Sequence, residues 1–210
     1  QLVRSHVPDI IVSDVMMPRM NGYELCKTIK EDIAISHIPV ILLTAKDDKQ
    51  SLISGYKNGA DGYLSKPFEV EMLMELIRNR LKNREYTKKR YLNAGLIPTP
   101  EESTISLTDE TFLIKLNSII QENIENSNLG IQFICQEVGL GRSSLYNKLK
   151  ALTGMGANEY ISKLRIEKAI TLISGTDMPF SEIAEKTGFT TPSYFSTAFK
   201  QYTGETPSQY

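Results

Sequence analysis

The sequence has few of the residues that build disulfide or metal frameworks, since its 210 residues include two cysteines and two histidines. Cys26 and Cys135 lack both the C-x-x-C spacing and the neighbouring histidine pair of a redox or zinc motif. We therefore expect two buried free thiols in a reducing compartment, and neither a disulfide nor a metal site built on cysteine.

Long apolar runs are also lacking. No segment approaches the roughly 20 apolar residues that a membrane-spanning helix needs, and no signal-peptide pattern opens the sequence. Basic residues (24) nearly balance acidic residues (25), and 40% of the residues are hydrophobic. This composition predicts a soluble, cytoplasmic chain with two domains. The expectation covers these residues alone, because upstream segments of a longer protein could anchor it in a membrane.

The first informative pattern is an apolar stretch, residues 10–12, that ends at Ser13 and Asp14. Pro18 and Gly22 then force a turn before a helix predicted over about residues 23–30. This order is typical of a strand, an acidic residue and a loop. Open parallel α/β sheets place their chemistry at the carboxyl ends of strands, so Asp14 is the first candidate site residue.

Two later predicted strands also end on polar side chains. Residues 38–43 are followed by Thr44, and residues 62–65 are followed by Lys66. In a parallel sheet these ends lie side by side, so a carboxylate nucleophile, a hydroxyl donor and a cation would converge. Each residue taken singly has a plainer reading as a turn residue, a strand-end hydroxyl or a solvated charge. Taken together, Asp14, Thr44 and Lys66 predict a phosphoryl-acceptor site.

Three segments carry a resemblance to the receiver domain of bacterial response regulators: SDVMMPRMNG at 13–22, LTA at 43–45 and KPF at 66–68. The resemblance implies a flavodoxin-like, doubly wound parallel sheet over residues 1–92. It also implies that Asp14 is the phosphoacceptor and a Mg²⁺ ligand, and that Thr44 and Lys66 contact the phosphoryl group. Tyr63 is then the aromatic switch, and the Lys66–Pro67 bond is cis.

The same resemblance implies that some elements of a receiver domain are not in this sequence. A receiver opens with a strand that ends in an acidic pair for Mg²⁺, and residues 1–7 look like the tail of its second helix. We therefore expect a partial sheet from a longer chain. Mg²⁺ is expected for an intact receiver, but Asp14 alone makes a poor octahedral oxygen site. These residues by themselves should bind Mg²⁺ weakly and accept phosphate inefficiently.

A helix is predicted over about residues 69–92, since its apolar residues keep helical spacing. Its basic end is better explained as a solvated face or linker than as a nucleic-acid contact. Gly95, Pro98 and Pro100 follow, which predicts an interdomain linker over residues 93–104.

The second half contains an internal repeat, in which residues 131–139 align with 180–188 at an offset of 49 residues. Each copy predicts a short helix, a glycine-containing turn and a second helix, at about 131–152 and 180–202. A plain helical hairpin would explain one copy. Two copies joined by a helix over about 157–173, roughly 25 Å long, favour two readers of adjacent major grooves.

This half, residues 105–210, is predicted to be all-α and resembles the AraC/XylS family of transcription factors. The segments that carry the resemblance are LYNKLKALTG at 145–154, LRIEKA at 164–169, IAEKTGF at 183–189 and SYFSTAFK at 193–200. By alignment, the residues implied to face DNA are Arg142, Ser143, Tyr146, Asn147 and Lys148 in the first copy, and Thr191, Ser193, Ser196, Thr197 and Lys200 in the second.

Charge differs between the copies. Between residues 141 and 168 six cations outnumber two acids, whereas the second copy is acidic and has Thr197 where the family usually has arginine. Because phosphate neutralisation supplies most non-specific affinity, we expect the first copy to dominate binding. The apolar residues of a helix that precedes the repeat, between 112 and 124, are predicted to form core and not a dimer seam.

Together the resemblances imply a phosphorylation-regulated, sequence-specific transcription regulator, as at the C-terminal end of a hybrid two-component sensor. Its expected partners are double-stranded DNA and a histidine kinase, in cis or in trans. The active form is expected to be a homodimer, and RNA polymerase is a further candidate partner. The segment itself is not expected to be an enzyme, although a kinase could lie upstream.

Two alternatives use the same residues differently. A haloacid-dehalogenase-like phosphohydrolase would use Asp14 as nucleophile but needs a second Asp two residues on, where Met16 stands. The other alternative is a pseudo-receiver, which is not phosphorylated, serves as an interaction platform and leaves DNA binding constitutive. That alternative stays open because the acidic pair is not in this sequence.

Overall fold

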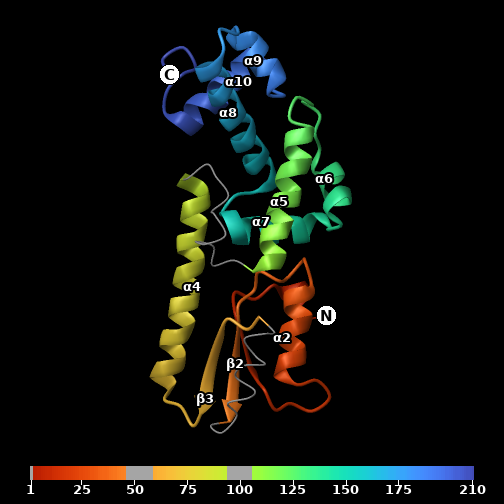
Figure 1. The fold of residues 1–210 in the computed structure, drawn as a ribbon, viewed down its shortest axis with the longest axis vertical. Helices are drawn as coiled ribbons and strands as arrows, with labels where there is room; N and C mark the ends of the chain where they lie inside the picture. The colour runs from red at the N-terminus through yellow and green to blue at the C-terminus, as the bar shows by residue number, and fades with distance from the viewer. Residues whose placement is uncertain (1, 46–58, 94–105) are drawn as a thin grey trace. The chain divides into compact units, whose positions relative to one another are not determined.

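The computed structural model describes residues 2–45, 59–93 and 106–210, which Figure 1 colours along the chain. The chain packs into two compact units. The first unit consists of Gln1–Phe112 and Asn147–Gly154, and the second consists of Leu113–Tyr146 and Met155–Tyr210. Most of the predicted linker, residues 94–104, lies outside the described residues. No described helix is long and apolar enough to cross a bilayer.

The first unit is built on three parallel strands in the order β1 (Ile11–Asp14), β2 (Val40–Ala45) and β3 (Gly62–Lys66). The central strand, β2, is almost wholly buried, as expected for a parallel strand covered on both faces. Asp14 pairs with Leu43, and Ala45 pairs with Lys66. The register therefore brings the carboxyl ends of all three strands to one edge.

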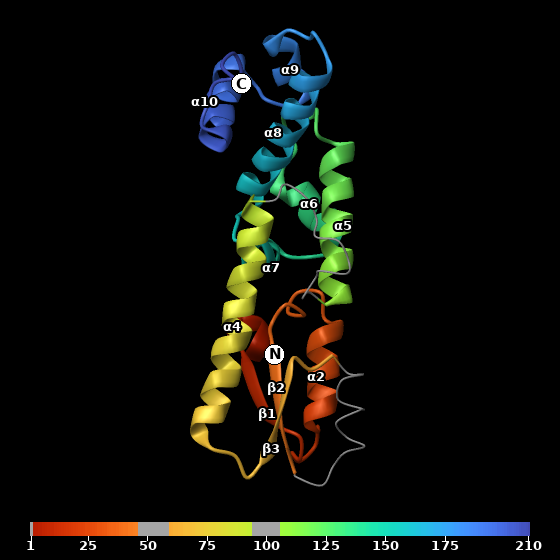
Figure 2. The same ribbon diagram turned by 60° about the vertical axis from the view of Figure 1, so that its left-hand side comes forward.

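The sheet of this unit has α2 (Gly22–Glu31) on one side and α4 (Val70–Asn93) on the other (Figure 2). A short helix, α1 (Leu2–His6), precedes β1. The predicted doubly wound α/β fold is thereby confirmed, and each of the predicted helices forms with its ends shifted by one or two residues. Cys26 is fully buried in the core of this unit, and Cys26 and Cys135 are both free thiols, as expected.

The start of α2 is fixed by a capping box. The Asn21 side chain accepts a hydrogen bond from the Glu24 N–H (2.9 Å), and the Glu24 carboxylate accepts one from the Asn21 N–H (3.0 Å). These bonds satisfy donors that a helix start leaves unpaired. The loop between Asp14 and α2 is thus anchored at both ends, because the Gly22 N–H also bonds the Val15 carbonyl (2.9 Å).

The remaining helices form the predicted all-α arrangement. They are α5 (Leu107–Glu122), α6 (Ile131–Val138), α7 (Arg142–Thr153), α8 (Ala157–Gly175), α9 (Phe180–Lys186) and α10 (Pro192–Thr203). The helix pairs α6–α7 and α9–α10 are the two copies of the repeat, and α8 joins them in sequence. The six residues predicted to form core are all buried, which confirms that prediction: Phe112, Leu113, Leu116, Ile119, Ile120 and Ile124.

The second copy closes around an aromatic cluster. The ring of Phe195 lies 5.3 Å from that of Phe189 and 5.6 Å from that of Phe199, measured between centroids. Tyr210 packs its ring on Phe199 at 5.5 Å. Tilted and edge-on aromatic pairs of this kind contribute beyond their buried area, so they hold α10 and the last residue against the same core.

The turn glycines of the two copies have the same backbone but different surroundings. Gly139 (φ 73°) and Gly188 (φ 71°) are both left-handed, which glycine adopts without strain. A Cβ on Gly139 would meet nothing within 4 Å. A Cβ on Gly188 would lie 2.2 Å from the Ile124 carbonyl oxygen and 2.9 Å from Nη2 of Arg165, which itself donates to the Asn126 carbonyl (2.7 Å).

This pair gives a matched test of packing in the second unit. Gly139→Ala should cost only the left-handed strain, about 1 kcal/mol of unfolding free energy. Gly188→Ala adds a clash with a backbone carbonyl and should cost roughly 1–3 kcal/mol more. Urea unfolding of both variants measures the difference. Equal losses would contradict the close approach of Ile124 to this turn.

Candidate functional site

Asp14 is the last residue of β1, and its side chain is held by two donors. One carboxylate oxygen accepts the Met16 N–H (3.1 Å), and the other is ion-paired with the ammonium of Lys66. The backbone is fixed by the Val15 N–H, which donates to the Leu43 carbonyl (2.9 Å). The hydrogen bond from Lys66, aided by that from Met16, lowers the pKa of Asp14 below its ordinary value. Asp14 is therefore an ionised, partly exposed carboxylate.

Thr44 lies on the central strand, one residue beyond the partner of Asp14. Its side chain is 2% exposed, and its hydroxyl has no hydrogen-bond partner among the described residues. A buried hydroxyl left unpaired costs roughly 1–3 kcal/mol. An acceptor oxygen arriving at this edge of the sheet would satisfy it.

The remaining two predicted residues come from β3. Lys66 precedes a cis peptide bond to Pro67, as the resemblance implied. Tyr63 is partly buried and packs against the core cluster that contains Val15 and Leu42. The structure thus brings Asp14 and Lys66 into contact and places Thr44 on the strand between them.

A divalent cation would need more oxygen ligands than this edge offers. Within the ranges that the structure describes, no group of three or more histidine, cysteine or acidic side chains could hold a metal ion. Asp14 alone supplies one carboxylate, and Lys66 already occupies part of it. Mg²⁺ favours an octahedral oxygen shell, so these residues by themselves do not fit it.

The predicted DNA contacts of the first copy lie on α7. Arg142, Ser143 and Tyr146 are exposed, and Asn147 is partly exposed. Arg142 donates to the Gln132 side chain on α6 (3.2 Å), which orients its guanidinium within the copy. These four side chains remain candidates for groove or phosphate contacts.

The prediction that Lys148 contacts DNA is wrong. Its side chain is completely buried, is ion-paired with Asp109 of α5, and lies 5.0 Å from the centroid of the Phe112 ring. Burial lowers its pKa, against the opposing effect of Asp109. Lys148 therefore cannot contact DNA phosphate in this structure. The sequence offered one signal of this burial, because Lys148 lies three residues after Leu145 and next to Leu149, which are both on the buried face of α7.

The second copy presents its candidates on α10. Thr191 caps the helix by accepting the Tyr194 N–H (3.2 Å), and Pro192 occupies the first turn. The exposed members of the predicted set are Thr191, Ser193, Thr197 and Lys200, while Ser196 is partly buried. The sequence reasoning missed Tyr194, whose ring is 55% exposed next to Ser193.

The burial of Lys148 reduces the difference in charge between the two copies. Exposed cations number two on α7, Arg142 and Lys150, and one on α10, Lys200. The first copy thus keeps an advantage for phosphate contacts, though a smaller one than its sequence suggested.

The ion pair at Asp14 can be tested by titration. Lys66→Gln replaces the ammonium that contributes most to lowering the pKa of Asp14 with a neutral amide, a weaker donor, so that pKa should rise toward the ordinary value of about 3.9. Lys27→Gln is the control, because Lys27 pairs with Glu31 at 3.8 Å on α2. Carboxyl ¹³C NMR of the Asp14 side chain follows the titration, and an unchanged Asp14 pKa in Lys66→Gln would refute the assignment.

The sequence matches two protein families, the response regulator receiver domain over residues 1–78 and a helix-turn-helix domain over residues 134–210. Histidine kinase P4 of Formosa agariphila is 42% identical over 210 residues, which cover all of this chain and 15% of that protein. The probable transcriptional regulator ycf29 of Pyropia yezoensis is 32% identical over 162 residues, covering 72% of this chain and 73% of that protein.

Among solved structures, the C-terminal domain of AraT, a response regulator from Geobacillus stearothermophilus, is similar with 31% identity and a TM-score of 0.45 over 51% of this chain and 85% of that one. The chain spans 15% of the length of the histidine kinase that it matches. Both matched families are regulatory modules rather than catalytic ones. The chain belongs to the response regulators and joins a receiver domain to an AraC-type helix-turn-helix domain of the kind found in DNA-binding transcription regulators.

Proposed function

We propose that this chain is the phosphorylation-controlled, sequence-specific DNA reader of a two-component system, with Asp14 as phosphoacceptor. The observation that carries the proposal is the ionised Asp14 in contact with Lys66 beside the unsatisfied hydroxyl of Thr44. In the proposal residues 1–92 are the receiver, 93–104 a linker and 105–210 the DNA-binding domain.

The proposed chemistry is a phosphoryl transfer from a phosphohistidine of a kinase, in the same chain or another. A carboxylate oxygen of Asp14 forms the new O–P bond as the P–N bond breaks, and the histidine keeps the electron pair and takes up a proton. The Lys66 ammonium then pairs with phosphoryl oxygens, and Thr44 donates its hydroxyl to one of them. In an intact receiver of this family Mg²⁺ would offset phosphoryl charge, with Asp14 as one of its ligands.

The added charge is proposed to act on the receiver surface through Thr44 and Tyr63. Thr44 lies on β2, which pairs with the strand of Asp14, and Tyr63 lies on β3, which pairs with β2 on its other side. In the proposal a shift of the Thr44 hydroxyl toward phosphate leaves room for the Tyr63 ring to change position. A changed surface would then favour pairing of two chains on DNA. A homodimer is the proposed active form, with RNA polymerase as a further partner.

DNA recognition is assigned to α7 and α10. Asn147 is suited to the donor and acceptor pattern of an adenine edge, and Arg142 to guanine or phosphate. The serine and threonine hydroxyls of α10 can serve several bases, while Lys200 is placed for phosphate.

The second candidate is the pseudo-receiver, an interaction platform that is not phosphorylated and leaves DNA binding constitutive. The two candidates differ in whether a phosphodonor changes DNA affinity in a chain that also contains the upstream acidic residues.

Sequence-specific DNA binding is tested first, by selecting binding sites for the 210-residue chain from random duplex DNA. We expect enrichment of two short motifs about one helical turn apart. Asn147→Ala should abolish enrichment of one motif, whereas Asn128→Ala, an exposed asparagine between α5 and α6, should not. If low salt yields no enrichment, the doubled helix pairs do something other than read DNA.

The two copies should contribute unequally. Asn147→Ala removes a two-point contact and should weaken specific binding by about 1–3 kcal/mol. Ser196→Ala removes a partly buried hydroxyl from the copy with one exposed cation on α10 and should cost less. Fluorescence anisotropy on the selected site at two salt concentrations compares them, and equal losses would argue against a dominant first copy.

A further inference from the structure

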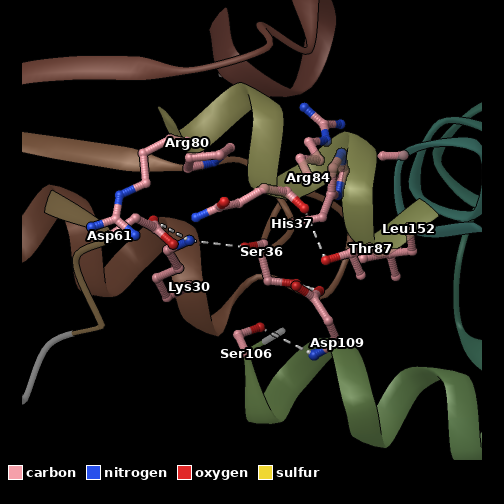
Figure 3. Close-up of a pocket in the computed structure, with 13 residues that line it drawn as sticks. Lys30, Ser36, His37, Asp61, Arg80, Arg84, Thr87, Ser106, Asp109 and Leu152 are labelled. Atoms are coloured by element: carbon pink, nitrogen blue, oxygen red, sulfur yellow. Dashed lines mark hydrogen bonds and ion pairs between the residues drawn. The ribbon is translucent and has the colours of Figure 1, made fainter. Parts of the chain in front are cut away.

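A second polar site lies at the opposite end of the sheet from Asp14. A cavity of about 120 Å³ is lined by Lys30 of α2, His37 and Pro39 ahead of β2, and Arg80 and Arg84 of α4 (Figure 3). All the residues that line it belong to the first compact unit. Because Pro39 immediately precedes β2 while Thr44 is near its end, this cavity and the phosphoacceptor are separated by the length of the strand.

The acidic groups at this cavity are already paired. Asp61 accepts the Lys30 ammonium at 2.8 Å and the Val40 N–H at 2.7 Å. Lys30 also donates to the carbonyls of Ser36 (3.2 Å) and Ile38 (3.0 Å). Asp109, which lines the cavity from α5, is ion-paired with the buried Lys148. Among the described residues, neither Asp61 nor Asp109 is ion-paired with Arg80 or Arg84.

Three basic groups at the cavity lack a buried acceptor. His37 is 7% exposed, and neither of its ring nitrogens has a hydrogen-bond partner within the described part of the chain. The Nε of Arg80 is buried and likewise unpartnered there. Arg84 donates to the Asp9 carbonyl (3.2 Å) and lies 3.7 Å from the Asp9 carboxylate, which is 89% exposed. Unsatisfied buried donors are uncommon and each costs free energy.

The surroundings of His37 are strongly positive. Burial first, and then the charges of Lys148 and Arg84, lower the pKa of His37 to about 3, with Lys30 acting in the same direction and Asp109 against it. His37 is thus a neutral imidazole at neutral pH, with one N–H free to donate. An anion in the cavity would accept that N–H and offset the adjoining cations.

We propose that this cavity binds a small phosphate-class oxyanion, held by the guanidinium groups of Arg80 and Arg84 and by the imidazole N–H of His37. Guanidinium presents a planar set of donors that matches phosphate oxygens. The volume is well below the 300 Å³ or more of sites for drug-sized ligands. A volume of about 120 Å³ favours inorganic phosphate over a phosphate carried on a nucleoside.

The chain's two histidines make the test direct, because His6 is exposed and serves as an internal reference. Imidazole resonances of the 210-residue chain are followed by NMR while inorganic phosphate replaces chloride at constant ionic strength. We expect the His37 resonances to shift saturably and those of His6 to stay in place. Adenosine monophosphate in a second titration should leave His37 unchanged, which separates free phosphate from a nucleotide phosphate.

Variants assign the binding groups. Arg80→Gln should weaken phosphate binding by about tenfold or more, the loss of a charge-assisted contact. Arg78→Gln is the matched control, because Arg78 lies two residues away on α4, is exposed and pairs with Glu75 (2.6 Å). If Arg80→Gln does not fold, Arg80→Lys keeps the charge but loses the fork of donors, and should also bind more weakly than the parent chain.

A further variant separates this cavity from the phosphoacceptor. Thr44→Ala alters the edge near Asp14 and should leave the His37 response intact. A His37 response lost in Thr44→Ala but kept in Arg80→Gln would assign the phosphate to the other site and overturn the proposal. So would an absence of any saturable His37 shift in the parent chain, in which case the cavity holds only water.

Discussion

The parallel register of β1, β2 and β3 is the constraint on which the receiver site depends. It brings the carboxyl ends of three strands, separated by dozens of residues in sequence, to one edge of the sheet. The central strand, β2, is almost wholly buried and pairs with β1 on one side and β3 on the other. Asp14 meets Lys66 only because this central strand is in place between them.

At that edge the chemistry is electrostatic. Lys66 keeps Asp14 ionised and close to a cation, so a phosphoryl group added there would find its counter-charge already positioned. The buried hydroxyl of Thr44 lacks an acceptor in the described residues, and phosphate would supply one. The amino end of the same strand has a related feature, since buried nitrogens of His37 and Arg80 have no hydrogen-bond partner in the described ranges. In both places a ligand oxygen would accept a hydrogen bond from a buried donor that the described residues leave unpaired.

The doubled helical module shows how two copies of one pattern diverge. Both turns contain a glycine in the left-handed conformation. The Ile124 carbonyl and the Arg165 guanidinium approach Gly188 closely, whereas no described atom approaches Gly139 in the same way. The charges diverge as well. The first copy uses Lys148 to neutralise Asp109 inside the structure and so has fewer cations free for DNA than its composition suggests.

The sequence by itself determined the elements, the repeat and the order of the site residues, because strand ends, turn glycines and helical periodicity are local signals. It predicted that Asp14, Thr44 and Lys66 share an edge, and most of the residues that it predicts to contact DNA are at least partly exposed, with Lys148 as the exception. Only the tertiary structure decided that Lys148 is buried and that the two ring nitrogens of His37 lie at a cavity without a hydrogen-bond partner among the described residues. Burial and pairing depend on groups such as Asp109 and Arg84, which lie far away in sequence and become neighbours only when the elements pack.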